Sequence, residues 1–163
     1  MGYPTTVRPA QSADIPHLAE YWYDNMVLLQ QSQPQVRLLP DAIQHWSDAA
    51  GDWLTDETVY FLVSETDTGQ LTGGIIAFQQ DNTPGLSPAR IAVLQDMVLD
   101  MHTKQTRGGL GRILLTALQD ALKADGITQL QVTVAARVAV QQAFWRSSSA
   151  THIYDSFWMT LTE

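Results

Sequence analysis

The chain has 163 residues, of which 45% are hydrophobic and 16% are charged, and its formal net charge at pH 7 is −8. This composition supplies the core of one packed domain over residues 1–163 and carries too little charge for a disordered chain. Because the sequence contains no cysteine, it excludes a disulfide scaffold, a thiolate nucleophile and any Cys-based metal site.

The charge is distributed unevenly along the chain. Residues 1–100 hold three basic and thirteen acidic residues, a net of −10, whereas residues 101–163 hold six basic and four acidic residues, a net of +2. Three of the nine basic residues, Lys104, Arg107 and Arg112, lie within nine consecutive positions. Nucleic-acid binding needs a broad basic footprint, so we expect no nucleic-acid partner and instead a compact anionic ligand at this cluster.

No apolar stretch is long enough to span a bilayer, and the first residues have neither the basic start nor the apolar core of a secretory signal. We therefore expect no membrane partner and a cytoplasmic location.

The first half of the chain predicts a strand, two helices and a strand pair. Residues 5–8 favour a short strand that Pro9 ends. A helix up to about residue 30 and a second one opened by Pro40 and Asp41 follow from apolar residues at helical spacing. Their stripes are Leu18, Trp22, Met26 and Leu29, then Ile43, Trp46, Ala50 and Trp53. The β-rich segments 59–63 and 73–78, separated by a turn, predict two paired strands.

The second half predicts three strands and two helices. The nearly unbroken apolar run 91–101 indicates a central strand buried on both faces. A glycine cluster at 108–111 leads into a helix with the stripe Leu110, Leu114, Ala117, Leu118 and Ala121, which Gly126 caps. A strand at 129–134, a helix at 138–146 and an aromatic-rich final strand at 152–161 complete the order βααβββαβαβ, which is that of one mixed α/β domain.

The glycine cluster is the segment that indicates chemistry. Glycines let backbone amides approach a ligand closely, and the first N–H groups of a helix have no intrahelical acceptors. Together with the helix dipole they form an anion site, to which the neighbouring basic side chains would add charge. The alternative is that the glycines only make a tight turn. A Walker loop and a dinucleotide fingerprint are excluded, because Arg112 and Leu114 stand where those motifs need other residues.

The run Asp96-Met97-Val98-Leu99-Asp100, followed by Arg107-Gly108-Gly109-Leu110-Gly111-Arg112, resembles motif A of the GCN5-related N-acetyltransferases. The segments Val7-Arg8-Pro9-Ala10 and Ala143-Phe144-Trp145, as well as the order of elements, also resemble this family. The resemblance implies an α/β fold with a mixed, strongly twisted central sheet of six to seven strands, flanked by about four helices.

The resemblance also implies a cofactor, acetyl-CoA, held in a gap between two central parallel strands that splay apart. Its diphosphate would lie on the backbone amides of the glycine loop, and its pantetheine arm would pair with the preceding strand, as in β-augmentation. The cofactor-binding residues would be Met97, Val98, Leu99, Arg107, Gly108, Gly109, Leu110, Gly111 and Arg112.

The implied reaction is direct transfer of an acetyl group to a primary amine of a small molecule, or to a protein amine, within a ternary complex. The amine must lose a proton before it attacks, and Asp96, a carboxylate in an apolar strand where burial favours a raised pKa, is our candidate base. Its alternative role is structural, bonded to backbone amides at a bulge.

The proton donor is less clearly marked. Many relatives have a tyrosine where this chain has Trp145, whose indole has no useful acidity. Tyr154, the nearest phenol in sequence, is the candidate acid, although a residue on a final strand is more often packed in the core or at an edge.

Two other functions remain open at this point. Trp145, together with Thr106 where relatives carry Gln or Arg, favours a module that binds CoA without turnover, in a regulatory role. A structural protein whose glycines only turn the chain is the third hypothesis. The four histidines are dispersed, so we expect no metal.

The surroundings of the site also leave alternatives. Trp22, Trp46 and Trp53 could line an acceptor groove, but aromatic residues at helical spacing favour the core. The acidic first hundred residues favour a cationic small-molecule amine as acceptor, or simply solubility. The aromatic residues near Tyr154 could either form a homodimer interface or be buried within one subunit.

Overall fold

The computed structural model describes residues 5–102 and 109–161. The predictions made for Lys104, Thr106, Arg107 and Gly108 therefore lie outside the described residues. The chain divides into two compact units, one up to Thr133 and one from Val134 onward, and each is described by itself.

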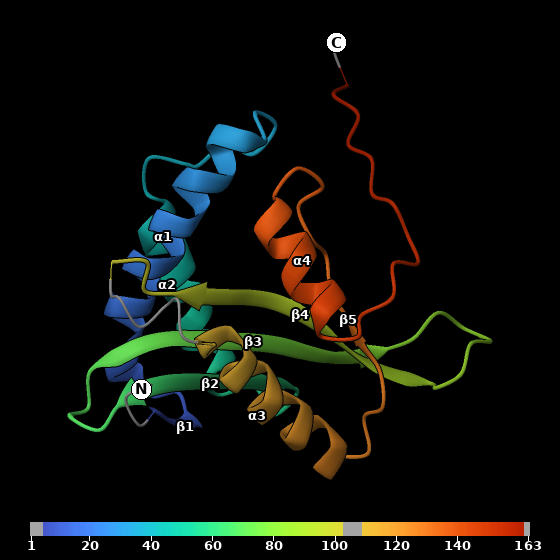
Figure 1. Ribbon diagram of the computed structural model, residues 1–163, viewed down its shortest axis with the longest axis horizontal. Helices are drawn as coiled ribbons and strands as arrows, with labels where there is room; N and C mark the ends of the chain where they lie inside the picture. Colours follow the sequence, from blue (N-terminus) through green and yellow to red (C-terminus); the bar gives the residue numbers. More distant parts are fainter. Residues whose placement is uncertain (1–4, 103–108, 162–163) are drawn as a thin grey trace. The chain divides into compact units, whose positions relative to one another are not determined.

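The first unit contains a mixed sheet with the strand order β1-β2-β3-β4-β5 (Figure 1). The strands β1 to β4 are antiparallel neighbours, and β4 pairs with β5 in parallel. Within the described residues the sheet has five strands, so the expected six to seven are not confirmed. The strands are β1 Thr5–Pro9, β2 Val59–Thr66, β3 Leu71–Asp81, β4 Arg90–Leu99 and β5 Leu130–Gln131.

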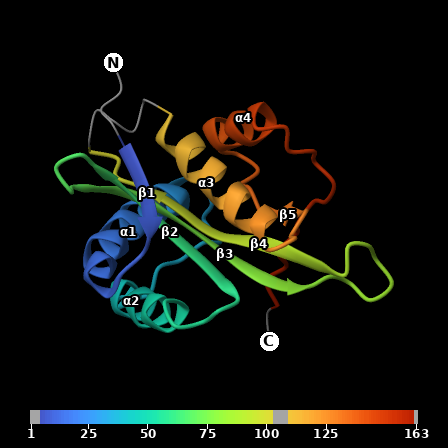
Figure 2. The same cartoon turned by 90° about the horizontal axis from the view of Figure 1, so that it is seen from below.

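Helices cover both faces of this sheet. Figure 2 shows α1 and α2 on one face and α3 on the other. These helices match the predicted ones closely, because their apolar stripes and end signals are local. They are α1 Ile15–Ser32, preceded by the 3₁₀ turn η1 Ser12–Asp14, α2 Ala42–Trp53 and α3 Leu110–Ala124.

The start of α1 is tied to the sheet by an ion-pair network. Arg8 on β1 contacts the Asp14 carboxylate at 2.8 Å and Glu65 on β2 at 2.8 Å. The Asp14 carboxylate also accepts a hydrogen bond from the backbone N–H of Gln11 at 2.8 Å. The hydrogen bonds from Arg8 and from the Gln11 N–H together hold the pKa of Asp14 below its ordinary value, although burial opposes them.

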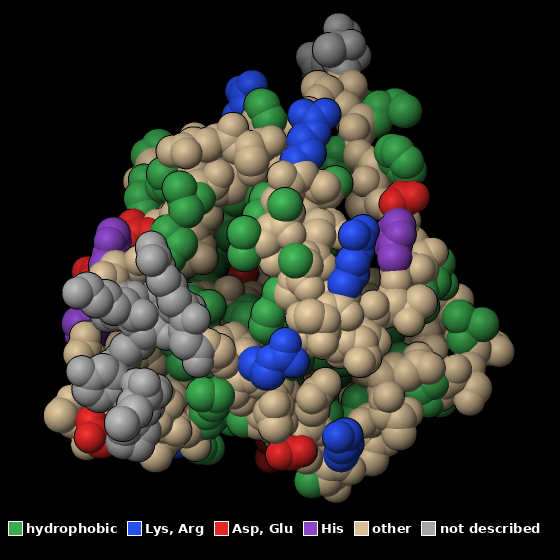
Figure 3. All heavy atoms as spheres, in the orientation of Figure 1, with side chains coloured by type: hydrophobic (Ala, Val, Ile, Leu, Met, Phe, Trp, Pro, Cys, Tyr) green, Lys and Arg blue, Asp and Glu red, His purple; other side chains and the backbone are tan. Residues whose placement is uncertain are grey.

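The apolar stripe of α2 matches the predicted one except at its first position. Ile43 is 41% exposed, whereas Ala42, Trp46 and Ala50 are buried. Hydrophobic side chains also reach the surface over α1, as Figure 3 shows, and Leu28 on that helix is 48% exposed. The prediction for Ile43 was therefore wrong: at the start of α2 the neighbouring Ala42 faces the core in its place.

Helix α3 ends as its sequence predicts. Gly126 follows the helix with a φ of +75°, a conformation that favours glycine. Its N–H donates to the Lys123 carbonyl at 3.0 Å, and the Ile127 N–H donates to the Leu122 carbonyl at 2.9 Å. These two bonds form a Schellman motif that satisfies carbonyls at the end of the helix.

Strand β4 differs from the predicted central strand. Its buried residues are Ile91, Ala92 and Val98, and the positions between Val93 and Met97 are exposed or only partly buried. In addition, β5 is two residues long and meets β4 only at Ala92 and Val93, so beyond Val93 this edge of β4 has no neighbouring strand among the described residues. The expectation of complete burial on both faces was therefore wrong.

The second unit contains α4, Ala139–Ser147, and no other helix or strand between Val134 and Leu161. The predicted final strand at 152–161 is thus wrong for the described residues. Aromatic and β-branched residues favour a strand only where a neighbouring strand supplies hydrogen bonds. No helix in the described part of the chain has the length and apolar character needed to cross a membrane.

Candidate functional site

The start of α3 presents backbone N–H groups, as the glycine cluster predicts. Gly109 is the N-cap residue and has a φ of +87°. The Arg112 and Ile113 amides both donate to the Gly109 carbonyl, at 3.0 and 3.1 Å. Leu110 and Gly111 occupy the first two helical positions, whose N–H groups have no acceptor within a helix. Among the described residues, a diphosphate would therefore meet these two amides, and Arg112 could contribute only through its side chain.

The end of β4 presents backbone groups on the side away from β3. The Asp100 N–H donates to the Thr72 carbonyl at 2.9 Å, so by alternation Val98 also faces β3, while Met97 and Leu99 face the opposite side. No strand of the described residues pairs with β4 on that side beyond Val93.

The side chain of Asn25 on α1 donates to the Leu99 carbonyl at 3.2 Å. Of the three residues expected to pair with a pantetheine arm, Val98 faces β3, while the N–H and C=O of Met97 and the N–H of Leu99 lie on the side where no described strand pairs with β4.

Helix α1 holds this end of β4 by further contacts. The Tyr21 hydroxyl donates to the Leu71 carbonyl at 3.1 Å on neighbouring β3. The buried Asp100 carboxylate accepts the His102 N–H at 2.9 Å, and the His102 ring contacts Asp24 at 3.0 Å. The strand end is therefore positioned by α1 as well as by the sheet.

Asp96 lies at a bulge in β4, on the face covered by α1 and α2. Ile76 on β3 pairs with Asp96 and the next residue, Ala77, pairs with Leu94, so Gln95 is the extra residue. The Asp96 Oδ2 accepts a hydrogen bond from the Trp46 indole N–H at 3.1 Å. Burial raises the pKa of Asp96 to about 6, and the Trp46 N–H opposes this rise. The raised pKa has the direction expected for the candidate base. The bulge was expected for the alternative, structural role, but the partner of the Asp96 side chain among the described residues is an indole N–H and not a backbone amide. The catalytic role of Asp96 stays a prediction.

Trp46 is part of a row of aromatic rings beneath Asp96. Trp22 stacks on Trp46 with ring centroids 5.8 Å apart, and Trp53 meets Trp46 edge-on at 5.9 Å. Phe78 on β3 extends the row beyond Trp53 at 5.4 Å. Trp46 is buried and the other two tryptophans are partly buried against the same core, which confirms the prediction that they belong to the core.

The bond between Trp46 and Asp96 was not predicted from the sequence. The two residues are 50 positions apart, and the apolar stripe of a helix does not indicate which strand its indole N–H will meet. The only available signal was that a buried tryptophan needs an acceptor.

The candidate acid Tyr154 and the substituted Trp145 belong to the second unit. Trp145 lies on α4, where its ring meets that of Phe144 edge-on at 5.1 Å. Tyr154 lies in the segment without regular structure, and its carbonyl contacts the His152 ring at 3.0 Å. Since the two units are described separately, no distance joins either residue to Asp96, and the role of Tyr154 stays a prediction.

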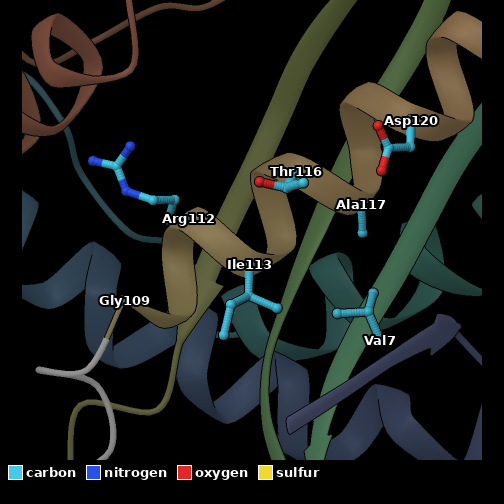
Figure 4. Close-up of a pocket in the computed structure, with 7 residues that line it drawn as sticks. All are labelled: Val7, Gly109, Arg112, Ile113, Thr116, Ala117 and Asp120. Carbon is cyan, nitrogen blue, oxygen red and sulfur yellow. The ribbon is translucent and has the colours of Figure 1, made fainter. Parts of the chain in front are cut away.

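A shallow groove of about 560 Å³ runs along α3. Figure 4 shows Ile113, Thr116, Ala117 and Asp120 on one side of the helix, with Val7 of β1 facing them. Because β1 and β5 are opposite edges of the sheet, this groove is not the predicted gap between β4 and β5. It shares only Gly109 and Arg112 with the expected cofactor residues. Within the described residues no group of His, Asp and Glu side chains could hold a metal ion.

No protein-family model matches this chain, and no curated protein matches it either. Solved structures do match. A predicted acetyltransferase with acetyl-CoA from Clostridium acetobutylicum has a TM-score of 0.73 at 12% identity, covering 98% of this chain and 96% of that one. An aminoglycoside 6′-N-acetyltransferase from Acinetobacter baumannii has a TM-score of 0.71 at 14% identity, covering 98% and 99%. A transcriptional regulator from Bacillus halodurans has a TM-score of 0.76 at 13% identity, covering 97% and 100%.

These identities are low, and the likeness extends over nearly the whole of each chain. It therefore establishes the fold. The segment around Asp96 and the glycine turn is a sequence feature that resembles proteins of the same fold. The chain has the fold of the GCN5-related N-acetyltransferases, as its resemblance to motif A predicts.

Proposed function

We propose that this protein is an acetyl-CoA-dependent N-acetyltransferase that acts on a primary amine by direct transfer. The observation that carries the proposal is the end of β4. Met97 presents backbone groups along an edge of β4 that no strand of the described residues pairs with beyond Val93, and the adjacent Asp96 presents a half-buried carboxylate with a pKa of about 6. One strand thus offers a place for an extended cofactor arm and a base beside it.

The described residues fit acetyl-CoA at two places. The left-handed conformation of Gly109 opens the start of α3, where the Leu110 and Gly111 amides and the helix dipole favour a diphosphate. The Met97 amide and carbonyl and the Leu99 amide suit pairing with the amide groups of a pantetheine arm. Arg107 and Gly108, which lie outside the described residues, complete the proposed set. When bound, acetyl-CoA supplies the activated acetyl group.

Asp96 performs the proton transfer in this proposal. Alkyl amines are largely protonated at pH 7, and an ammonium has no lone pair with which to attack. With a pKa of about 6 the Asp96 carboxylate is mostly ionised at pH 7, so it accepts the amine proton directly or through a water molecule. Tyr154 is the proposed donor of a proton to the departing thiolate.

The acceptor that we propose is a cationic small-molecule amine. Residues 1–100 carry a net charge of −10 from thirteen acidic and three basic residues. These residues include α1 and α2 and the Asp96 face of the sheet, so the local field favours a positively charged acceptor.

The cofactor site is tested with two glycines at opposite ends of α3. Gly109 and Gly126 both have positive φ values, +87° and +75°, and a Cβ at either would meet no atom within 4 Å. Alanine at either position therefore introduces similar backbone strain, about 1–2 kcal/mol. By isothermal titration we expect Gly109→Ala to weaken CoA binding about tenfold or more and Gly126→Ala to leave it unchanged. Absence of CoA binding by the wild-type protein at millimolar ligand would refute the proposal.

A second function, CoA binding without turnover, is favoured by Trp145 in the place where many relatives of this fold have tyrosine. The two functions are separated by a panel of amines with a free-thiol readout in the presence of acetyl-CoA. Release of thiol that depends on one added amine supports the transferase. Tight CoA binding without release for any amine supports the binding module.

A further inference from the structure

We propose that Trp46 is a positioning residue for Asp96, whose Oδ2 it holds by its indole N–H so that Oδ1 faces the acceptor amine. The inference rests on the proposed function for its catalytic meaning. The contact itself is a property of the fold, in which a helix side chain meets a strand side chain 50 residues away at 3.1 Å.

The indole of Trp46 is fixed by packing on several sides. Trp46 is 5% exposed. Trp22 stacks on its ring at an interplanar angle of 22°, and Trp53 meets it edge-on at 88°. Rotation of the indole would disturb both contacts and the core beneath them. The N–H therefore has a set direction, and it points at one oxygen of Asp96.

The other oxygen of Asp96 has a different environment. Within the described residues, the Trp46 bond is the hydrogen bond made by the Asp96 side chain. Asp96 is only partly buried, so Oδ1 is the oxygen that can receive a proton from a ligand or a water molecule. A carboxylate held through one oxygen by a rigid donor keeps the second oxygen in place, which is what proton transfer to a positioned base requires.

The neighbours of Asp96 make Trp46 the dominant polar influence on it. Its cross-strand partner on β3 is Ile76, and the facing side chain of α2 is Trp46, both uncharged. Among the described residues of α1, α2 and β3, no charged side chain contributes to the pKa of Asp96, which burial raises and the Trp46 N–H lowers. Loss of that N–H should therefore raise the pKa of Asp96 further.

The test compares Trp46→Phe with Trp53→Phe. Trp53 lies on the same helix and in the same row of rings but does not bond Asp96, so it controls for loss of aromatic packing. The readout is the carboxyl carbon resonance of Asp96 followed by NMR as a function of pH. We expect a midpoint at about 6 in the wild-type protein, a rise of roughly half a unit to one unit in Trp46→Phe, and no change in Trp53→Phe. Equal midpoints in all three proteins, or an equal rise in both variants, would overturn the proposal.

A second measurement does not depend on the folding of either tryptophan variant. In the wild-type protein the indole N–H resonance of Trp46 should titrate with the midpoint of Asp96, and in Asp96→Asn it should not titrate in that range. A Trp46 resonance that is insensitive to pH in the wild-type protein would also overturn the proposal.

Turnover gives a third readout that separates this inference from the proposed function. With an accepted amine, Trp46→Phe should move the rising limb of kcat/KM to higher pH by the same amount as the NMR midpoint and lower kcat about tenfold, with KM little changed. An unchanged pH profile in an active variant counts against positioning. If no amine is acetylated by the wild-type protein, the proposed function fails, while the two NMR results still decide whether Trp46 holds Asp96.

Discussion

The two faces of the sheet are packed by different types of side chain. The face under α3 is covered by buried leucines of that helix and, apart from Gly111, the buried residues of α3 are all aliphatic. The face under α1 and α2 contains a row of tryptophans and the half-buried Asp96. The buried side chains of α3 contribute packing, while the other face combines packing with a partly buried titratable group whose charged form the core disfavours.

This difference indicates which face lowers the stability of the folded state. An aliphatic face can be packed without unsatisfied polar groups, whereas a half-buried carboxylate destabilises the folded state wherever it is ionised. Such a group is retained at positions where a shifted pKa is useful, which is why perturbed carboxylates mark candidate sites. Substitutions on the two faces should therefore differ in how their effects depend on pH.

The largest effect is expected for Asp96→Asn. Loss of the base should reduce acetylation about 100-fold or more. The folded-state pKa, about 6, is above the ordinary value of 3.8, so the folded protein binds the proton more tightly than the unfolded one and wild-type stability falls as pH rises between these values.

Asp96→Asn lacks the destabilisation caused by the ionised carboxylate, because asparagine carries no charge. It should be more stable than the wild type by about 3 kcal/mol at pH 7 and equally stable near pH 4, as measured by urea denaturation. If Asp96→Asn is instead less stable than the wild type at pH 7, the Asp96 carboxylate stabilises the folded state and does not destabilise it.

The opposite face should respond without pH dependence. Leu118 on α3 is fully buried, and Leu118→Ala should lower the free energy of unfolding by about 2–5 kcal/mol. Because leucine does not ionise and the buried residues of α3 are leucines and one glycine, the loss should be the same at pH 5 and pH 8. Thr116→Ala, at an exposed position of the same helix, should change stability by less than about 0.5 kcal/mol. A pH-dependent loss in Leu118→Ala would remove the distinction between the faces.

A smaller effect is expected in the strand pair that both faces share. A Cβ on Gly73 of β3 would lie 2.7 Å from the Val98 carbonyl oxygen and 2.9 Å from Leu99 Cδ2. The carbonyl belongs to the β4 backbone and can move only with the strand, so Gly73→Ala should destabilise the protein by about 1–3 kcal/mol.

The matched control for Gly73 is Gly51 in α2, where a Cβ would meet no atom within 4 Å. Gly51→Ala should stabilise the protein by up to about 1 kcal/mol, because alanine favours a helix. Thermal unfolding of the two variants measures the difference. Equal destabilisation in both would mean that the contact with β4 is not what requires glycine at position 73.

Much of the fold was predictable from local patterns. The helices α1 and α2 follow from apolar spacing, with Pro40 and Asp41 before α2, and the end of α3 follows from Gly126. Elements that depend on distant partners were less accurate. The expected strand at 129–134 is paired over two residues only, and the aromatic segment 152–161 forms no strand, because strand formation needs a neighbour that local propensity does not supply.

The candidate site also combines features that local sequence predicts with contacts that depend on distant partners. The sequence pattern pointed to Asp96 as a carboxylate with a raised pKa and to the glycine turn as a place for backbone amides. It did not indicate that the Arg112 amide is already bonded to Gly109, that Asn25 occupies the Leu99 carbonyl, or that Trp46 meets Asp96. Each of these is a contact whose partner is set by how an element packs or turns.

By itself, then, the sequence determined the helices, the turn residues, the order of elements as far as α4 and the residue types that the proposed reaction would need, since all of these depend on neighbours within a few positions. Only the tertiary structure decided which face of the sheet holds the carboxylate, which backbone groups of β4 are left for a ligand and which indole holds Asp96. The physical reason is that hydrogen bonds and burial between distant segments depend on register and packing angle, which are properties of the assembled core.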